Sequence, residues 1–73
     1  MKPNGATVTA KFRDENLPDI RQDATPETVM AVADHLSKTY AGLKAIYIES
    51  PDRTVVYNAR MEFLFWVPKD SGE

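Results

Sequence analysis

A chain of 73 residues without cysteine forms one small domain that must fold without a disulfide or a thiolate metal site. Its hydrophobic content of 42% is that of a globular domain rather than of a disordered chain. The net charge of −2, with no run of basic residues, disfavours non-specific binding to nucleic acid or to an anionic membrane. We expect a flexible lead-in at residues 1–5, a single domain at 6–68 and a flexible tail at 69–73.

The first predicted element is a half-buried strand at residues 7–13. Val8, Ala10 and Phe12 fall on one face of this strand, and polar side chains alternate with them. Turn-forming residues follow at 14–19, where Pro18 disfavours both a helix and a central strand. Residues 20–23 form either a short strand that returns beside the first or an extended connection, and we favour the strand.

A helix is predicted next. Thr25 is the expected N-cap, because its hydroxyl can accept a hydrogen bond from the first turn, and Pro26 suits the first helical position. Gly42 is the residue expected to end the helix. An apolar stripe at helical spacing lies between them, made of Val29, Val32, Ala33, Leu36 and Tyr40.

A hairpin with an unusually long second arm ends the domain. A strand at residues 43–49 has Ile46 and Ile48 on one face, and a turn is expected at residues 50–53. From Val55 to Val67 every odd position is apolar, and neither glycine nor proline interrupts the pattern. One continuous strand of this length would extend about 43 Å, whereas a compact domain of this size is roughly 30 Å across. Either the strand bends or breaks near residues 58–60, or its end extends beyond the core.

The end of this long strand is the main candidate functional surface. Contiguous apolar surface usually marks an interface, and a strand edge can pair with another chain. We favour burial of the segment by a second copy of the chain or by a protein partner. In the alternative, the sheet curls and covers the segment itself. The expected contact residues are Met61, Phe63, Leu64, Phe65, Trp66 and Val67.

Binding of single-stranded nucleic acid to the open face of the sheet is the second hypothesis. Aromatic side chains can stack on bases while basic side chains meet phosphates. However, Glu49 and Glu62 interrupt this face, no RNA-binding aromatic motif occurs, and the net charge is unfavourable. The residues that would form the face are Lys11, Arg13, Tyr47, Arg60 and Trp66.

The sequence offers few groups for catalysis. His35 is the single histidine and is expected on the helix surface, where it has neither a second metal ligand nor a nucleophile to activate. The acids at 14, 15 and 19 lie in a turn, where no burial separates their pKa values. The three glycines are too far apart for a phosphate-binding loop. We therefore expect a non-enzymatic protein with no cofactor and no metal.

The combined pattern predicts an α+β fold. One helix packs on a three- to four-stranded, mostly antiparallel sheet as a two-layer sandwich, in the order strand, short strand, helix, strand, long strand. No secretory signal is recognised, and the apolar run at 63–67 is too short to span a membrane, so we expect a cytoplasmic protein of bacterial or phage type. The expected core is Val8, Ala10, Phe12, Val29, Val32, Ala33, Leu36, Tyr40, Ile46, Ile48, Val55, Tyr57 and Met61.

Overall fold

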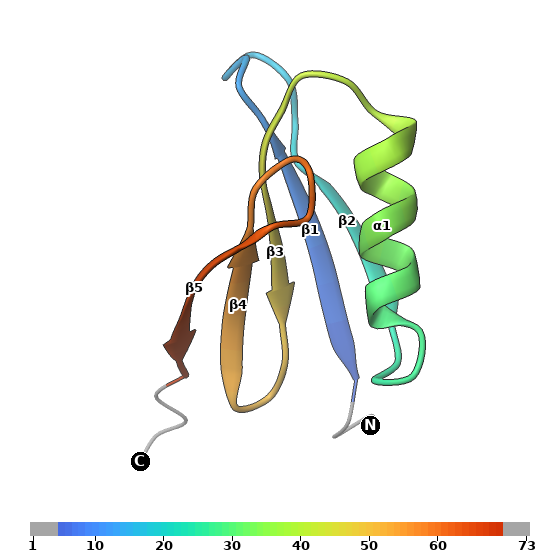
Figure 1. Ribbon diagram of the computed structural model, residues 1–73, viewed down its shortest axis with the longest axis vertical. Coiled ribbons are helices and arrows are strands. Elements are labelled where there is room, and N and C mark those ends of the chain that lie inside the picture. The colour runs from blue at the N-terminus through green and yellow to red at the C-terminus, as the bar shows by residue number, and fades with distance from the viewer. Residues whose placement is uncertain (1–4, 70–73) are drawn as a thin grey trace.

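Five antiparallel strands and one helix make up the computed structural model, which describes residues 5–69 (Figure 1). The strands lie side by side in the order β2-β1-β3-β4-β5. The α+β prediction is therefore confirmed, with more strands than expected. Most of the predicted lead-in and tail lies outside the described residues. The elements are β1 (Ala6–Phe12), β2 (Ile20–Ala24), α1 (Val29–Thr39), β3 (Leu43–Glu49), β4 (Arg53–Tyr57) and β5 (Phe63–Pro68).

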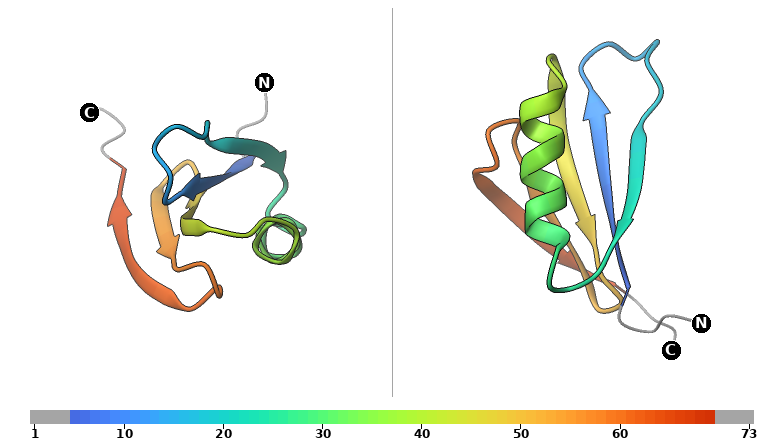
Figure 2. Two further views of the ribbon diagram at one scale, coloured as in Figure 1. Left: turned by 90° about the horizontal axis from the view of Figure 1, so that it is seen from above. Right: turned by 90° about the vertical axis from the view of Figure 1, so that its right-hand side faces the viewer.

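The helix covers only one part of the sheet. It packs on β1, β3 and β2. Viewed from above, the sheet is strongly curved, and β5 lies at the opposite end of the molecule from α1 (Figure 2). Two layers are thus formed over β2, β1 and β3, whereas β4 and β5 extend beyond the helix.

The alternation predicted for the first and third strands is confirmed by their register. Val8 pairs with Ile48, and Ala10 pairs with Ile46, so these four side chains share the face under the helix. The short strand favoured at residues 20–23 is also present. It is β2, which pairs with β1 in an antiparallel hairpin.

The helix begins later than predicted. The carbonyl of Thr25 accepts the N–H groups of Thr28 and Val29, and the hydroxyls of Thr25 and Thr28 are hydrogen-bonded to each other at 3.0 Å. A turn therefore precedes the helix, and Thr28 rather than Thr25 occupies the N-cap position. At the other end Gly42 has the expected positive φ of 76°, although the regular helix already ends at Thr39.

The apolar stretch from Val55 to Val67 is not one long strand, and the break considered near residues 58–60 is confirmed, because the chain turns back after Tyr57. Residues 58–62 form a tight connection, and β5 returns antiparallel along β4. This hairpin supplies the fifth strand. Neither glycine nor proline marks this turn in the sequence, because Met61 rather than glycine takes the positive φ of 63° that the connection requires.

The core lies between α1 and the β1–β3 part of the sheet. Six predicted residues are buried there, together with Leu43, which was not predicted: Val8, Ala10, Ala33, Leu36, Ile46 and Ile48. Phe12, Val29, Val32, Tyr57 and Met61 are partly buried against them. The prediction fails for Tyr40, which is exposed, and for Val55, which is only half-buried. Val56 is buried instead, on the face opposite the helix.

Candidate functional site

Strand β5 is an edge of the sheet and carries five consecutive exposed apolar side chains. Its neighbour within residues 5–69 is β4 alone, so its outer edge is unpaired in this part of the chain. The exposed fractions are 58% for Phe63, 48% for Leu64, 52% for Phe65, 51% for Trp66 and 48% for Val67. These are five of the six residues predicted to form an interface. The curl of the sheet does not bury them.

The register divides these side chains between the two faces of the sheet. Trp66 lies opposite Val55 and Phe63 lies opposite Tyr57, on the side that carries the helix. Phe65 and Val67 lie on the open side, opposite Val56 and Thr54. The β5 edge is therefore apolar on both faces, which is unusual for a strand in contact with water.

Two aromatic contacts hold the side chains on the helix side of β5. The rings of Phe63 and Tyr57 meet edge to face with their centroids 6.2 Å apart. The guanidinium of Arg53 lies 5.1 Å from the centroid of the Trp66 ring, a cation–π distance. Both contacts connect β5 to β4, so the apolar side chains are oriented by the hairpin itself.

Phe65 and Tyr47 flank a buried side chain on the open face. Val56 of β4 pairs with Tyr47 on one side and with Phe65 on the other, and only 3% of Val56 is exposed. The aromatic side chains of β3 and β5 thus cover it in place of a second helix. This arrangement explains why the buried residue of β4 is Val56 rather than the predicted Val55.

The turn between β4 and β5 is organised by Asn58. Its side-chain oxygen accepts the N–H groups of Arg60 and Glu62, each at 2.9 Å, and its amide donates to the Glu62 carboxylate at 2.9 Å. The N–H of Met61 donates to the Asn58 carbonyl at 2.9 Å. Met61, the sixth predicted interface residue, consequently lies partly buried against the core, apart from the exposed five.

The outer edge of β5 presents the backbone of Trp66. The N–H of Lys69 donates to the carbonyl of Asp52, so these two residues form a hydrogen-bonded pair of the β4–β5 ladder. Such positions alternate along an antiparallel pair, so Val67 and Phe65 direct their backbone groups toward β4. The N–H and C=O of Trp66 then point away from β4. Pro68 lacks an N–H and limits pairing beyond this point.

The residues predicted for nucleic-acid binding are separated by the fold. Lys11 and Tyr47 lie together on the open face, with the lysine Nζ 5.9 Å from the ring centroid. Trp66 is on the other face of the sheet. Arg13 and Arg60 line a separate hollow with Lys44, which was not predicted because its position depends on an irregularity in the β1–β3 register.

The charge of Lys11 is balanced by a carboxylate on the neighbouring loop. Its Nζ donates to Oδ2 of Asp19 at 2.9 Å. The hydrogen bond that Lys11 donates to Asp19 and the charge of that carboxylate raise the pKa of Lys11. Lys11 is therefore less available to a phosphate than the sequence suggested.

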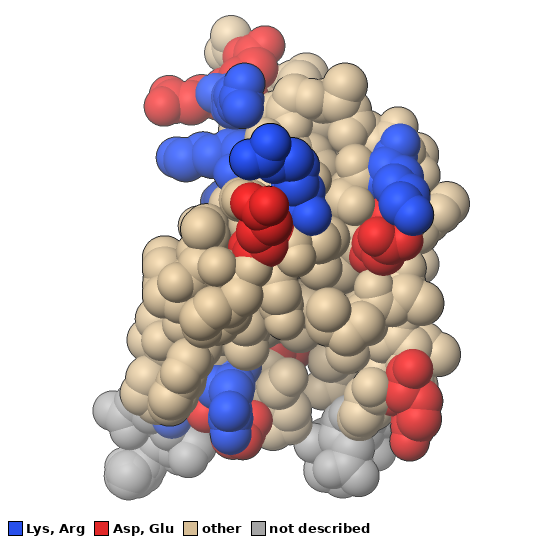
Figure 3. All heavy atoms as spheres, in the orientation of Figure 1, with Lys and Arg blue, Asp and Glu red and all other residues tan. Residues whose placement is uncertain are grey.

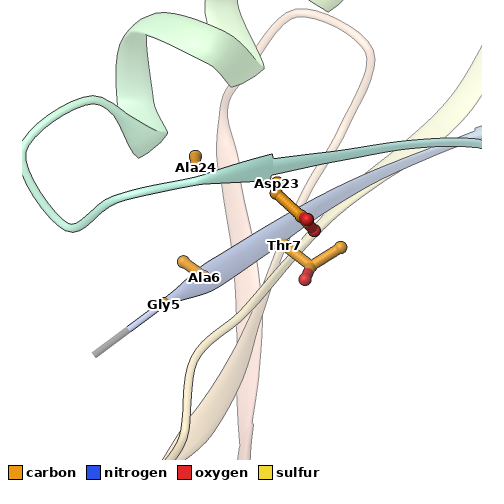
Figure 4. Close-up of a pocket in the computed structure, with 5 residues that line it drawn as sticks. All are labelled: Gly5, Ala6, Thr7, Asp23 and Ala24. Carbon is orange, nitrogen blue, oxygen red and sulfur yellow. The ribbon is translucent and has the colours of Figure 1, made fainter. Parts of the chain in front are cut away.

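A second hollow, of about 260 Å³, lies at the opposite edge of the sheet between β1 and β2. Figure 4 shows Thr7 and Asp23 with their side chains toward one side of this pair of strands, and Ala6 and Ala24 toward the other. Among the described residues, Asp23 is the one ionisable side chain in its lining. No group of three or more potential metal ligands occurs within the part of the chain that the structure describes. Nor does any helix between residues 5 and 69 have the length and apolar character needed to cross a membrane.

Comparisons with protein-family models, with curated proteins and with solved structures give no match to this chain.

Proposed function

We propose that this chain is a small, cytoplasmic, non-catalytic assembly protein that associates with a second copy of itself through β5. The observation that carries this proposal is the run of five half-exposed apolar side chains on an edge strand, Phe63–Val67. Apolar surface of this kind usually marks an interface, and a strand edge offers backbone groups for pairing.

The composition of β5 supports a second copy as the partner. None of its six residues is charged, so two β5 strands can approach each other without repulsion between like charges. Antiparallel pairing of a strand with its own copy satisfies a two-fold axis, the commonest symmetry of soluble oligomers. The same apolar side chains would then be buried on both partners.

The backbone of β5 favours a pairing centred on Trp66. Its N–H and C=O point outward, so two Trp66 residues facing each other would exchange two hydrogen bonds. In this register Phe65 of one copy faces Val67 of the other on the open side of the sheet. Pro68 keeps the ladder short, so most of the association energy would come from the apolar side chains.

Sedimentation equilibrium over a wide concentration range tests the proposal. We expect the wild-type chain to form a dimer, and Phe65→Glu to give a folded monomer, because a buried carboxylate opposes association. Leu17→Glu is the matched control, since Leu17 is a similarly exposed apolar residue in the β1–β2 loop and should leave the dimer intact. A wild-type chain that stays monomeric throughout would refute self-association.

Amide hydrogen exchange tests the register independently. The Trp66 amide should exchange rapidly in the Phe65→Glu monomer and slowly in the wild-type dimer, whereas the Val67 amide should be protected in both. A dimer in which the Trp66 amide remains unprotected would show that association does not use this edge.

A further inference from the structure

A hollow lined by basic residues lies at the end of the sheet near the β4–β5 turn. Its volume is about 370 Å³, within the range of roughly 300–1,000 Å³ common for ligand sites. Figure 3 shows Lys and Arg side chains in the upper part of the molecule, with Asp and Glu side chains beside them. The residues that line the hollow are Arg13, Leu43, Lys44, Asn58, Ala59 and Arg60.

Three separate segments bring the basic residues to this hollow. The N–H of Arg13 donates to the carbonyl of Gly42 at 3.0 Å, which holds the end of β1 against the start of β3. The register of these strands shifts there, so that Lys44 has no cross-strand partner on β1 and is exposed. Arg60 is placed by the Asn58-centred turn. The fold thus assembles the cluster from positions that are distant in the sequence.

The local charge is positive although the chain is acidic overall. Arg60 has one carboxylate nearby, that of Glu62 at 3.6 Å, and Asn58 also holds this carboxylate. Within residues 5–69, neither Arg13 nor Lys44 lies within 4.0 Å of a carboxylate oxygen. Among the residues that line the hollow and their ion-pair partners, three cations thus face one carboxylate, whereas the whole chain carries −2.

We propose that this hollow binds the phosphate groups of a small anionic molecule. Guanidinium groups present paired N–H donors that match phosphate oxygens, and a lysine adds a compact positive charge. Asn58 also lines the hollow, and its side-chain amide has a second N–H besides the one that it donates to Glu62. Among residues 5–69, no aromatic residue lines the hollow, so this part of the chain offers no stacking surface there of the kind that single-stranded nucleic acid uses. This site is independent of the β5 edge and of self-association.

Titration of the full-length chain with sodium pyrophosphate, followed by amide chemical shifts, tests the proposal. We expect shifts at residues 13, 42–44 and 58–62, with affinity reduced about tenfold by Arg13→Gln or Arg60→Gln. Lys38→Gln removes the same charge from a helix lysine paired with Asp34, and it should leave binding unchanged. An equal loss in Lys38→Gln, or shifts spread over the whole surface, would show attraction by overall charge alone and overturn the site.

A gain of affinity provides a second readout. Glu62→Gln removes the carboxylate beside Arg60 and keeps an oxygen to accept the Asn58 amide, so pyrophosphate should bind about threefold more tightly. An oligothymidylate titration separates the two sources of phosphate. Binding of this oligonucleotide by a chain that does not bind pyrophosphate would overturn the small-anion proposal in favour of nucleic acid.

Discussion

The two ends of the sheet differ in what covers them. In the part formed by β2, β1 and β3, the helix lies on one face, and Val8, Ala10 and Ile46 are fully buried. In the part formed by β4 and β5, the helix is in contact through Met30, whose sulfur accepts a hydrogen bond from the Tyr57 hydroxyl at 3.8 Å, and β5 leaves five apolar side chains about half exposed. The two parts have similar apolar sequence patterns, yet only one of them forms a core.

The width of the helix explains this difference. A helix with its side chains is about 10–12 Å wide, and neighbouring strands lie about 4.8 Å apart. One helix aligned with the strands therefore covers two or three of them, and α1 packs on β1, β3 and β2. A sheet of five strands exceeds this by two or three, so most apolar residues of β4 and β5 must be covered by one another or by another molecule.

The same substitution in both parts gives the largest expected difference. Val8→Ala should lower the free energy of unfolding by about 2–3 kcal/mol, because it removes buried methyl groups and leaves a cavity under the helix. Val67→Ala should cost less than about 1 kcal/mol in the monomer, since half of that side chain already contacts water. Urea unfolding at a concentration below the association range measures both values. Equal costs would mean that β5 contributes to the core as much as β1.

Backbone conformation gives a second, smaller effect in the covered part, that is, the part of the molecule formed by α1 and by β2, β1 and β3. Gly42 has a φ of 76°, and a Cβ added there would meet no heavy atom within 4 Å. Gly42→Ala should therefore lower the free energy of unfolding through backbone strain alone, by about 1 kcal/mol. Gly42→Asn should cost less, because asparagine tolerates this conformation. If Gly42→Ala and Gly42→Asn lower the free energy of urea unfolding equally, backbone strain at the positive φ is not the cause of the loss.

The open face of the covered part contains a buried hydroxyl whose removal should be favourable. Thr9 is buried between Arg21 and Tyr47 on the neighbouring strands, and its Oγ1 has no hydrogen-bond partner among the described residues. Thr9→Val keeps the shape and should raise the free energy of unfolding by up to about 1 kcal/mol. Val8→Thr is the reverse change on the helix side of the sheet and should lower the free energy of unfolding. Loss of stability in Thr9→Val would indicate that the hydroxyl is satisfied in solution.

The covered part could be predicted well from the sequence because its signals are local. Alternating residues define β1 and β3, and the helical stripe identifies Ala33 and Leu36 as core. The predicted start of α1 was less accurate, because the hydroxyls of Thr25 and Thr28 are hydrogen-bonded to each other rather than to the first turn of the helix. Burial of Leu43 depends on the register shift between β1 and β3, which alternation alone does not reveal.

The β4–β5 part shows the limit of such reasoning. Strict alternation from Val55 to Val67 could not decide between a continuous strand and a break near residues 58–60. The turn depends on five hydrogen bonds made by Asn58 and on a positive φ at Met61. Neither feature changes the apolar pattern. The five exposed apolar residues could be predicted nonetheless, because the helix was too small to cover the whole sheet. The basic hollow could not be predicted from the sequence, because it joins residues from three separate segments.

The smallest expected effect concerns the ion pair between Lys11 and Asp19. Asp19→Asn should lower the pKa of Lys11 toward its ordinary value of 10.5, because it removes the hydrogen bond and the charge that raise it. Asp23→Asn is the control, since this aspartate of β2 makes no such contact with Lys11. Titration of the lysine side chain by NMR measures the shift.

Since the folded-state pKa of Lys11 is raised, the stabilisation by the ion pair should be complete below pH 10.5 and disappear as the pH rises through the raised value. The wild-type and Asp19→Asn chains should then have equal stability at the most alkaline pH. A difference that persists there would assign the effect of Asp19 to packing of the β1–β2 loop rather than to charge.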